Sequence, residues 1–373
     1  MKISIQRNDL LEALNIVMKA VPSRTTLPIL ECILIEAETN RIMVSASDSE
    51  TGIKTIKASR VDESGAIAVE AKIFSSIVRK LPDNEISIET NADNKMTIVC
   101  EGVRYAISGK DPEEFPELPQ IQTRAIYVIS HYALKEMVNR TNFSIAPMEE
   151  RGNALMSGQL FEVKDSTLRL VSLDGYRISI RKEKLKDVSE DISVVVPGKA
   201  ISDVAKLLSS DNEKEVTVTV GANHIMFEFD DTRAVCRLVD GKYFAIDNIL
   251  SLDYETKVII NRRHFLECVD RSSLLVREID KKPVILDIKE GVMNISMRTG
   301  LGRMQEEIDI VKMGKDIMIG LNPKFLMDAL RAVDDEEISL YLINPKAPCY
   351  IHDDADSYNY VIQPVNFKIT EED

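Results

Sequence analysis

The stretch Lys2–Ala20, KISIQRNDLLEALNIVMKA, contains the pattern that decides the fold. Apolar and polar residues alternate over Lys2–Ile5, as in a strand with one buried face. Apolar residues then recur at three- and four-residue spacing over Asn8–Ala20, which predicts an amphipathic helix. Asn8 stands where a side chain could accept hydrogen bonds from the free N–H groups of the first helical turn. The stretch therefore predicts a strand followed directly by a capped helix.

The same strand–helix pattern opens two further long segments of the chain. Ser130 and Asn261 stand at the N-cap positions of the two predicted helices. The strands are predicted at 125–129 and 257–260, and the helices at 130–141 and 261–276.

A second copy of the pattern occurs midway through each of the three segments. The predicted strand and helix pairs are 66–69 with 71–81, 193–196 with 198–208, and 316–320 with 323–333. A polar turn and further alternating strands follow each helix. The sequence thus predicts six strand–helix–strand–strand–strand units, paired into three domains at 1–122, 123–251 and 252–373. The predicted class is α+β, with two helices packed on antiparallel sheets in each domain.

The overall charge is acidic, but it is unevenly distributed. The 373 residues carry a formal net charge of −14, which taken alone argues against a nucleic-acid partner. The six predicted helices contain thirteen basic and seven acidic residues, so they sum to +6 and leave −20 on the remainder. Solvated helix faces with Lys and Arg in their last turns explain this pattern. A basic helical surface that holds phosphates inside an acidic shell explains it equally well.

Cysteine and histidine spacing predicts no metal or cofactor site. The five cysteines are widely spaced without a CxxC pair, which is typical of reduced thiols in a cytoplasmic protein. Residues 1–7 lack the apolar core of a signal peptide, and no run approaches eighteen apolar residues. We therefore expect a cytoplasmic protein without a membrane partner.

Two other function classes have some support in the sequence. Asp48 and Asp174 occupy comparable places in the first two segments, as carboxylates for acid–base chemistry would. The chain has no GxSxG, GxxxxGK[ST], HExxH or GxGxxG motif, and turn formation explains both aspartates better, so we predict no enzyme. A repeat-built scaffold that binds proteins without encircling DNA is the remaining alternative.

Five segments, in order along the whole chain, carry a more specific signal. They are Ser23–Leu30 (SRTTLPIL), Phe115–Pro116, Ser172–Arg177 (SLDGYR), Leu238–Tyr243 (LVDGKY) and Tyr360–Phe367 (YVIQPVNF). Together they resemble signature segments of the bacterial beta sliding clamps, the beta subunits of DNA polymerase III. The resemblance implies a non-catalytic processivity factor, of which two subunits close head to tail into a ring around double-stranded DNA. It also implies a clamp loader, and DNA polymerases and repair proteins that carry clamp-binding peptides, as partners.

The resemblance implies a peptide-binding cleft between the second and third domains. Adaptable apolar side chains with a few polar groups suit such a cleft. Phe244, Gln363 and Asn366 depart from the common family residues, and a polar tail spans 368–373. The matching positions are Met156, Leu173, Gly175, Tyr176, Arg177, Ile178, Phe244, Asn248, Ile249, Val361, Gln363, Pro364, Val365, Asn366 and Phe367.

The resemblance also implies DNA-contacting residues and a subunit interface. The expected DNA contacts are Arg24, Lys72, Arg79, Lys199 and Lys206, positions that solvated surface side chains would fit as well. The expected interface residues are Arg104, Tyr105 and Ile107 on a strand of the first domain, and Leu274 and Leu275 in the third. Pairing between strand edges would extend the sheets from one subunit to the next. Leu274 and Leu275 would otherwise be ordinary core residues.

Overall fold

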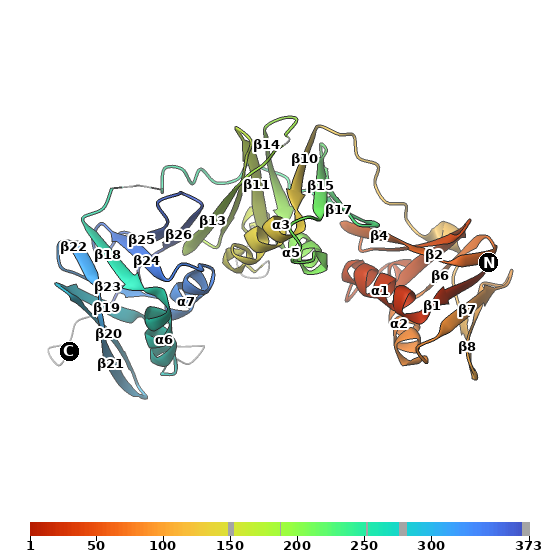
Figure 1. The fold of residues 1–373 in the computed structure, drawn as a ribbon, viewed down its shortest axis with the longest axis horizontal. Coiled ribbons are helices and arrows are strands. Elements are labelled where there is room, and N and C mark those ends of the chain that lie inside the picture. Colours follow the sequence, from red (N-terminus) through yellow and green to blue (C-terminus); the bar gives the residue numbers. More distant parts are fainter. Residues whose placement is uncertain (148–152, 187, 251–252, 276–281, 368–373) are drawn as a thin grey trace. The chain divides into compact units, whose positions relative to one another are not determined.

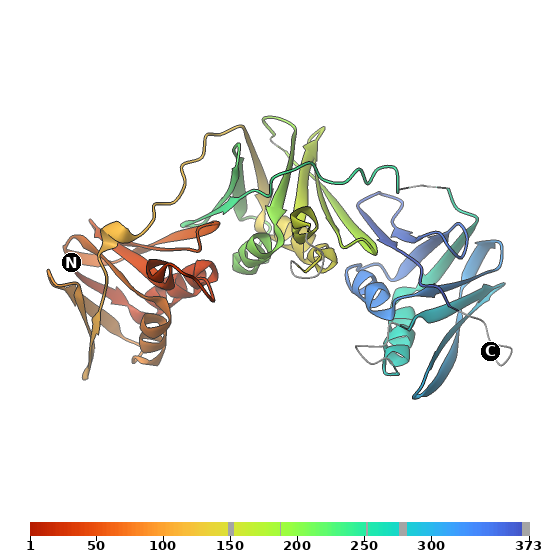
Figure 2. The ribbon, with the colours of Figure 1, turned by 180° about the vertical axis from the view of Figure 1, so that it is seen from behind.

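The computed structural model describes residues 1–147, 153–186, 188–250, 253–275 and 282–367. Its elements follow one another in six groups, each a strand, a helix and three strands (Figures 1 and 2). Short extra strands, β5 (Arg60–Glu63) and β22 (Val311–Gly314), end the first and fifth groups. Within the described ranges the helices are α1 (Arg7–Val17), α2 (Ala71–Lys80), α3 (His131–Asn139), α5 (Gly198–Leu207), α6 (Arg262–Ser273) and α7 (Pro323–Arg331).

The chain forms two compact units. Unit 1 comprises Met1–Lys135, Lys186–Glu190 and Lys199–Leu238. Unit 2 comprises Glu136–Leu185, Asp191–Gly198 and Val239–Asp373. The central third of the chain is divided between the two units. The boundaries of the compact units therefore differ from those of the three predicted domains.

Unit 1 contains two antiparallel sheets. The five-stranded sheet has the order β5-β1-β7-β8-β9, and the eight-stranded sheet has the order β10-β15-β16-β17-β4-β3-β2-β6. The strands are β1 (Lys2–Gln6), β2 (Cys32–Glu38), β3 (Arg41–Ser47), β4 (Thr51–Ala58), β6 (Gly65–Glu70), β7 (Glu85–Thr90), β8 (Lys95–Cys100), β9 (Val103–Ser108), β10 (Ala125–Ser130), β15 (Glu215–Val220), β16 (His224–Phe229) and β17 (Thr232–Arg237).

Backbone pairing between β4 and β17 joins the first and central thirds within unit 1. Thr55 lies opposite Thr232 in this antiparallel ladder, and Ile53 lies opposite Ala234. The two threonine hydroxyls are 3.0 Å apart and buried. The eight-stranded sheet therefore crosses the predicted domain boundary without interruption.

Unit 2 also contains two antiparallel sheets. The nine-stranded sheet has the order β14-β11-β12-β13-β26-β25-β24-β18-β22, and the four-stranded sheet has the order β21-β20-β19-β23. The strands are β11 (Gly158–Lys164), β12 (Thr167–Leu173), β13 (Arg177–Lys184), β14 (Ile192–Pro197), β18 (Thr256–Asn261), β19 (Val284–Lys289), β20 (Val292–Thr299), β21 (Gly302–Asp309), β23 (Ile317–Leu321), β24 (Glu337–Leu342), β25 (Cys349–His352) and β26 (Tyr358–Ile362). Here the pairing of β13 with β26 joins the central and last thirds.

The helices bury one face and expose the other. In α2, Ala71, Phe74 and Val78 are fully buried, whereas Lys72 and Arg79 are exposed. This three- and four-residue spacing is the amphipathic pattern predicted from the sequence. α1 packs beside α2 in unit 1, and α6 packs beside α7 in unit 2 (Figures 1 and 2).

Two of the three predicted helix caps are confirmed, and the third is wrong. The Ser130 hydroxyl accepts from the Ala133 N–H at 3.1 Å, and Asn261 Oδ1 accepts from the His264 N–H at 3.0 Å. Asn8, predicted to cap α1, lies inside that helix. The helix begins at Arg7 instead. The Arg7 N–H, which has no acceptor within the helix, donates to the Asn84 carbonyl at 3.1 Å.

The nine-stranded sheet has an apolar cluster on each face. On the helix side, Val258, Leu340 and Tyr360 pack with residues of α6 and α7. On the outer side, Ile178 and Val361 belong to a separate cluster with residues of the segment 239–250. Because side chains alternate along a strand, one set of strands builds both clusters.

The described part of the chain contains no helix long and apolar enough to cross a membrane. All five cysteines are buried and unpaired. Burial raises the pKa of Cys236 and of Cys349 to about 12, so both thiols stay protonated at neutral pH.

Candidate peptide-binding cleft and nucleic-acid interface

The predicted cleft residues gather in unit 2, where β13 and β26 run side by side. Ile178 lies directly opposite Val361 in this ladder. Beyond the paired strands, the Gln363 N–H donates to the Tyr176 carbonyl at 2.8 Å. The fold thus brings the SLDGYR and YVIQPVNF segments, far apart in the sequence, into one site.

The floor of this site is apolar. Leu173, Ile178 and Val361 are nine-tenths or more buried within the outer cluster of the nine-stranded sheet. Met156 and Phe244 are half-buried and pack against that cluster from outside the sheet. Side chains of this type can accommodate apolar anchors of different shape.

The rim of the site is exposed and largely polar. Tyr176 is 48% exposed and Ile249 is 39% exposed. The Tyr176 ring stacks on Phe325 of α7, with centroids 6.3 Å apart. The other predicted rim residues, all exposed, are Gly175, Asn248, Gln363 and Asn366.

An ion pair holds the segment 239–250 near the outer face of the sheet. Arg169, on β12, contacts Asp247 at 2.7 Å and Glu162 at 2.7 Å. Hydrogen bonding from Arg169 lowers the pKa of Asp247 below its ordinary value, so this carboxylate is charged at neutral pH. The Tyr350 hydroxyl adds a hydrogen bond to the Ile249 carbonyl at 2.9 Å.

The two aspartates considered for catalysis form turns. Asp48 Oδ1 accepts from the Glu50 and Thr51 N–H groups at 3.1 and 2.7 Å. Asp174 Oδ1 accepts from the Tyr176 and Arg177 N–H groups at 2.9 and 3.1 Å. Both are local side-chain-to-backbone turns, as predicted.

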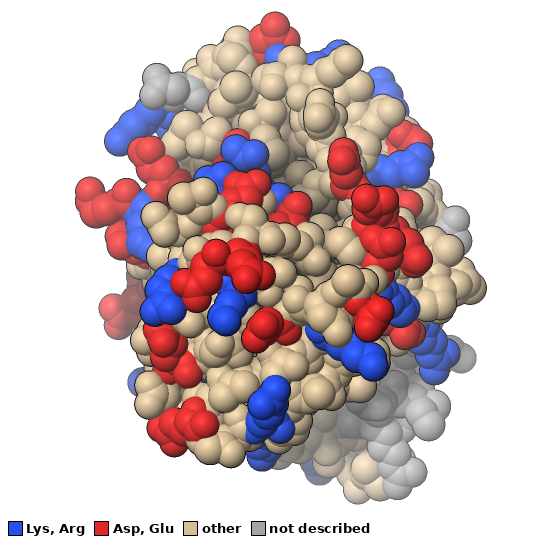
Figure 3. All heavy atoms as spheres, turned by 90° about the vertical axis from the view of Figure 1, so that its right-hand side faces the viewer, with Lys and Arg blue, Asp and Glu red and all other residues tan. Residues whose placement is uncertain are grey.

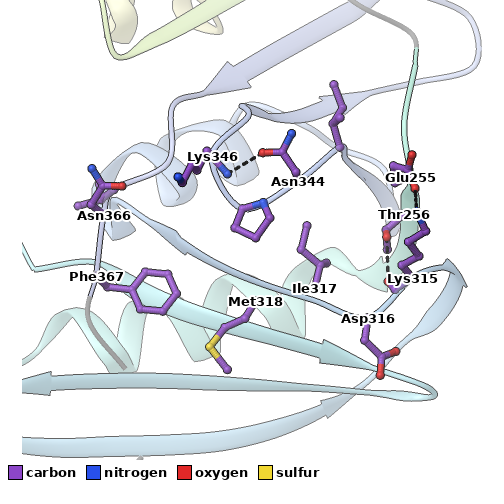
Figure 4. Close-up of a pocket in the computed structure, with 13 residues that line it drawn as sticks. Glu255, Thr256, Lys315, Asp316, Ile317, Met318, Asn344, Lys346, Asn366 and Phe367 are labelled. Carbon is purple, nitrogen blue, oxygen red and sulfur yellow. Dashed lines mark hydrogen bonds and ion pairs between the residues drawn. The ribbon is translucent and has the colours of Figure 1, made fainter. Parts of the chain in front are cut away.

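The last part of the cleft continues into a groove that sequence patterns did not indicate. The Val365 N–H donates to the Gly320 carbonyl at 2.8 Å, and a Cβ at Gly320 would come within 2.7 Å of the Phe367 ring. Beside this segment lies a cavity of about 710 Å³ with Phe367, Ile317 and Met318 along one side (Figure 4). Its lining comes from strands and turns that are separate in the sequence, so no local motif marks it.

The predicted DNA contacts all lie in unit 1, and their surroundings differ. Arg24, Lys72 and Arg79 are exposed and form no ion pair with the described residues. Among the described residues, the Arg79 guanidinium donates to the Asn15 side chain, at 3.3 Å. Lys80, which the sequence did not single out as a DNA contact, belongs to the same exposed face of α2.

Lys199 and Lys206 of α5, by contrast, share an acidic partner. Asp203 lies one turn away on the same helix, 3.4 Å from Lys199 and 3.1 Å from Lys206. Asp48, in the turn between β3 and β4, is 4.0 Å from Lys199. These two lysines are therefore partly neutralised before any phosphate binds.

Charge is segregated less sharply than the sequence predicted. With the observed bounds, the described helices contain twelve basic and seven acidic residues, a net charge of +5. Figure 3 faces the end of unit 1 that carries β7 and β8, where Lys and Arg are interspersed with Asp and Glu. That face is mixed and not uniformly acidic.

Comparison with known proteins decides the family. Models of the DNA polymerase III beta subunit match its N-terminal domain to residues 1–119, its central domain to 128–244 and its C-terminal domain to 248–366. A beta sliding clamp of Staphylococcus aureus is 30% identical over 98% of this chain and 99% of its own length.

The chain belongs to the bacterial beta sliding clamp family. It is a processivity factor of DNA polymerase and a non-catalytic polymerase III subunit, as the sequence predicted. The three matched models confirm three clamp domains. The bounds at 122 and 251 remain predictions, and residue 251 lies outside the described residues.

Solved clamps share the whole fold. A putative DNA polymerase III beta subunit of Eubacterium rectale is 50% identical, with a TM-score of 0.95 over 98% of this chain and 99% of that one. The Bacillus subtilis sliding clamp is 30% identical, with a TM-score of 0.94 over 99% and 100%. The Pseudomonas aeruginosa clamp, solved bound to griselimycin, is 26% identical, with a TM-score of 0.91 over 98% and 100%.

The predicted interface residues of this clamp lie on an edge strand of unit 1 and just after helix α6 of unit 2. Arg104 and Tyr105 are exposed and Ile107 is half-buried on β9, the edge strand of the five-stranded sheet. Leu274, just after α6 in unit 2, is 79% exposed, so its alternative assignment to the core is wrong. Leu275 is half-buried and packs against the core.

Proposed function

We propose that two copies of this clamp close head to tail into a ring around double-stranded DNA. The observation that carries the proposal is an edge strand in each unit among the described residues, with a large apolar side chain exposed on β9 and another at the end of α6, the helix that packs against β21. β9 and β21 are edge strands, and Tyr105 and Leu274 are 39% and 79% exposed. Edge-to-edge pairing between copies would satisfy their backbone groups and cover these side chains.

A hollow beside β9 supports this arrangement. It measures about 370 Å³ and is lined by Lys72, Ile73, Ser76, Ile77 and Lys80 of α2, and by Tyr105. Ile73 is 47% exposed there. We propose that Leu274 of a second copy fills the hollow, with Leu275 supporting it from behind.

The proposed DNA contacts come from exposed basic side chains of unit 1. Arg24 and the α2 residues Lys72 and Arg79 carry charges that no described carboxylate pairs with. Lys199 and Lys206 add weaker contacts, because Asp203 competes for them. Such contacts recognise phosphates without regard to sequence, which suits a protein that slides along the duplex.

The cleft of unit 2 is the proposed docking site for partner proteins. Its buried floor and polar rim fit short peptides with apolar anchors, carried by DNA polymerases, repair proteins and the clamp loader that opens the ring. We also propose that griselimycin, the ligand of the Pseudomonas aeruginosa clamp, binds this chain. The proposed location is the cytoplasm, where DNA and these partners are found.

Retention on DNA tests the ring. The purified protein should run as a dimer in size exclusion with light scattering. Loaded by a clamp loader on nicked circular DNA, it should stay bound until a restriction enzyme cuts the circle, and then slide off the ends. Equal loss from circular and linear DNA would instead favour a scaffold that does not encircle DNA.

Truncation tests the cleft separately. A chain ending at Ile362 lacks residues 363–373, which include the predicted cleft residues Gln363–Phe367, but keeps β26. A fluorescein-labelled peptide, selected for binding to the wild-type protein, should lose most of its affinity for the truncated chain in fluorescence anisotropy. Unchanged affinity would rule out the cleft assignment.

A further inference from the structure

Arg177 lies between two cleft residues but faces away from the cleft. It is the first residue of β13, with Tyr176 of the rim before it and Ile178 of the floor after it. Side chains alternate along a strand, so Arg177 lies on the helix side of the sheet. Only 8% of the residue is exposed.

Acidic and backbone groups surround the Arg177 guanidinium. Nε donates to Asp174 Oδ2 at 3.1 Å, and Nη1 donates to Asp328 Oδ2 at 2.6 Å. Nη2 donates to the Phe143 carbonyl. Asp328 belongs to α7, so the Arg177 side chain links the start of β13 to that helix.

Two aromatic rings enclose the same guanidinium. Its central carbon is 4.3 Å from the Phe325 ring centroid and 5.3 Å from that of Phe143. A lysine could not replace Arg177 here. Its ammonium group can neither stack on both rings nor donate in several fixed directions as the planar guanidinium does. The charge is therefore held inside the protein and is not presented to a peptide.

The groups that bind Arg177 also support the cleft rim. Phe325 stacks on Arg177 and on Tyr176. Asp174 binds the guanidinium through Oδ2 and holds the Tyr176 N–H through Oδ1. Loss of the guanidinium would thus release the turn that carries Tyr176 and the ring beneath it.

We propose that Arg177 is a positioning residue for the peptide cleft, acting on Tyr176 through Asp174 and Phe325 and on α7 through Asp328. The inference rests on the proposed peptide-binding function of the cleft. It assigns a supporting role to Phe325 and Asp328, and it replaces direct peptide contact as the role of Arg177.

Arg181 provides a matched control on the same strand. It lies four residues further along β13, on the same face, and donates to the Ala332 carbonyl just after α7. Its guanidinium packs against Tyr358 and Tyr360 at 4.8 and 5.8 Å. Arg181 therefore also ties β13 to the end of α7, but through groups away from the rim.

Peptide affinity separates positioning from general destabilisation. The probe is the fluorescein-labelled peptide selected on the wild-type protein, and each variant is also melted to measure its Tm. Arg177→Lys and Asp328→Asn should each weaken binding about tenfold or more, because a supporting contact of the rim is lost. Arg181→Lys should lower the Tm comparably but keep the affinity within about twofold of wild type.

A spectroscopic signal follows the rim directly. The chain contains no tryptophan, so Tyr176→Trp introduces a unique emission. Adding Arg177→Lys should shift this emission to longer wavelength without peptide, as the ring leaves Phe325. Adding Arg181→Lys should leave it unchanged.

Two results would overturn the inference. One is wild-type peptide affinity in Arg177→Lys, and the other is an equal loss in Arg177→Lys and Arg181→Lys. Failure of the cleft itself is distinguishable, because the chain truncated after Ile362 would then bind the peptide as well as wild type does.

Discussion

Gln159 is a fully buried polar side chain in unit 2 that joins two strands to the turn after α3. Its Nε2 donates to Thr141 Oγ1 at 2.6 Å and to Ser172 Oγ at 2.9 Å. Its neighbours along the two strands, Leu160 and Val171, point to the opposite face of the sheet and belong to the outer apolar cluster. Loss of the amide N–H groups would leave the two buried hydroxyls without this donor, whereas Gln159 Oε1 has no partner among the described residues.

Gln159→Leu should therefore lower the free energy of unfolding by about 1–3 kcal/mol, the cost of leaving buried partners unsatisfied. Urea denaturation followed by circular dichroism measures the change. Gln122→Leu, at an exposed position, serves as the control and should have almost no effect. An equally small effect at Gln159 would contradict this account of the network.

His131 makes stability depend on pH. It is 1% exposed, and its Nδ1 accepts from the Ser209 N–H at 3.3 Å. Burial lowers the pKa of His131 below its ordinary value of 6.5, although the nearby Asp230 carboxylate opposes the shift. The unfolded chain therefore binds this proton more readily than the folded one. Stability from this group is complete above about pH 6.5 and decreases as the pH falls below it.

The urea midpoint of the wild-type protein should accordingly fall between pH 7.5 and pH 5.5. His131→Asn, whose Oδ1 can still accept from Ser209, should show a smaller fall over the same interval. The same pH dependence in both proteins would show that other groups cause it.

The secondary elements were predictable because their periodicity is local. The predicted helix at 71–81 is α2, Ala71–Lys80, and the predicted strand at 125–129 is β10, Ala125–Ser130. The cap at Asn8 is wrong because α1 begins at Arg7, which makes Gln6 the N-cap residue. The Asn84 carbonyl, from a distant turn, accepts from the first helical N–H. Local patterns identify elements well, but they do not identify long-range partners.

In the candidate cleft, too, the sequence predicts local features but not long-range contacts. Family signature segments predict Ile178, Tyr176 and Val361 as cleft residues, and the fold brings these three together. They could not show that Arg177 is buried, because its partner Asp328 is 151 residues away and belongs to an ordinary amphipathic helix. The groove beside Phe367 was missed for the same reason.

The two basic helices of unit 1 should contribute differently to DNA binding. On α2, Arg79→Gln, which lies outside the hollow of the proposed interface, should reduce the slope of log K against log salt by about 0.9, the value of one lost phosphate contact. On α5, Lys199→Gln should have a smaller effect, because Asp203 already neutralises part of that charge. Duplex affinity over a series of salt concentrations measures both slopes.

Asp203→Asn is the complementary variant. It frees both Lys199 and Lys206 while leaving the helix otherwise intact, so duplex affinity and the salt slope should rise. Unaltered binding by Asp203→Asn would indicate that α5 does not face DNA.

In the proposed ring the two copies meet at Leu274, so this exposed leucine should determine whether the dimer assembles. Leu274→Asp places a charge at the proposed interface and should convert the dimer to monomers in size exclusion with light scattering. Ile126→Asp, at a side chain that is 41% exposed on β10, is the control and should remain dimeric. A dimer with Leu274→Asp would place the interface elsewhere.

The sheets that cross between thirds of the chain also constrain the order in which it can fold during synthesis. β4 ends at Ala58, but its partner β17 begins only at Thr232. At ribosomal rates of about 5–20 residues per second, the edge of β4 stays open for roughly 10–35 s. β13 waits similarly for β26, which begins at Tyr358. During synthesis the chain therefore exposes two unpaired strand edges that could pair with other chains. Binding of chaperones at this stage would protect it from aggregation.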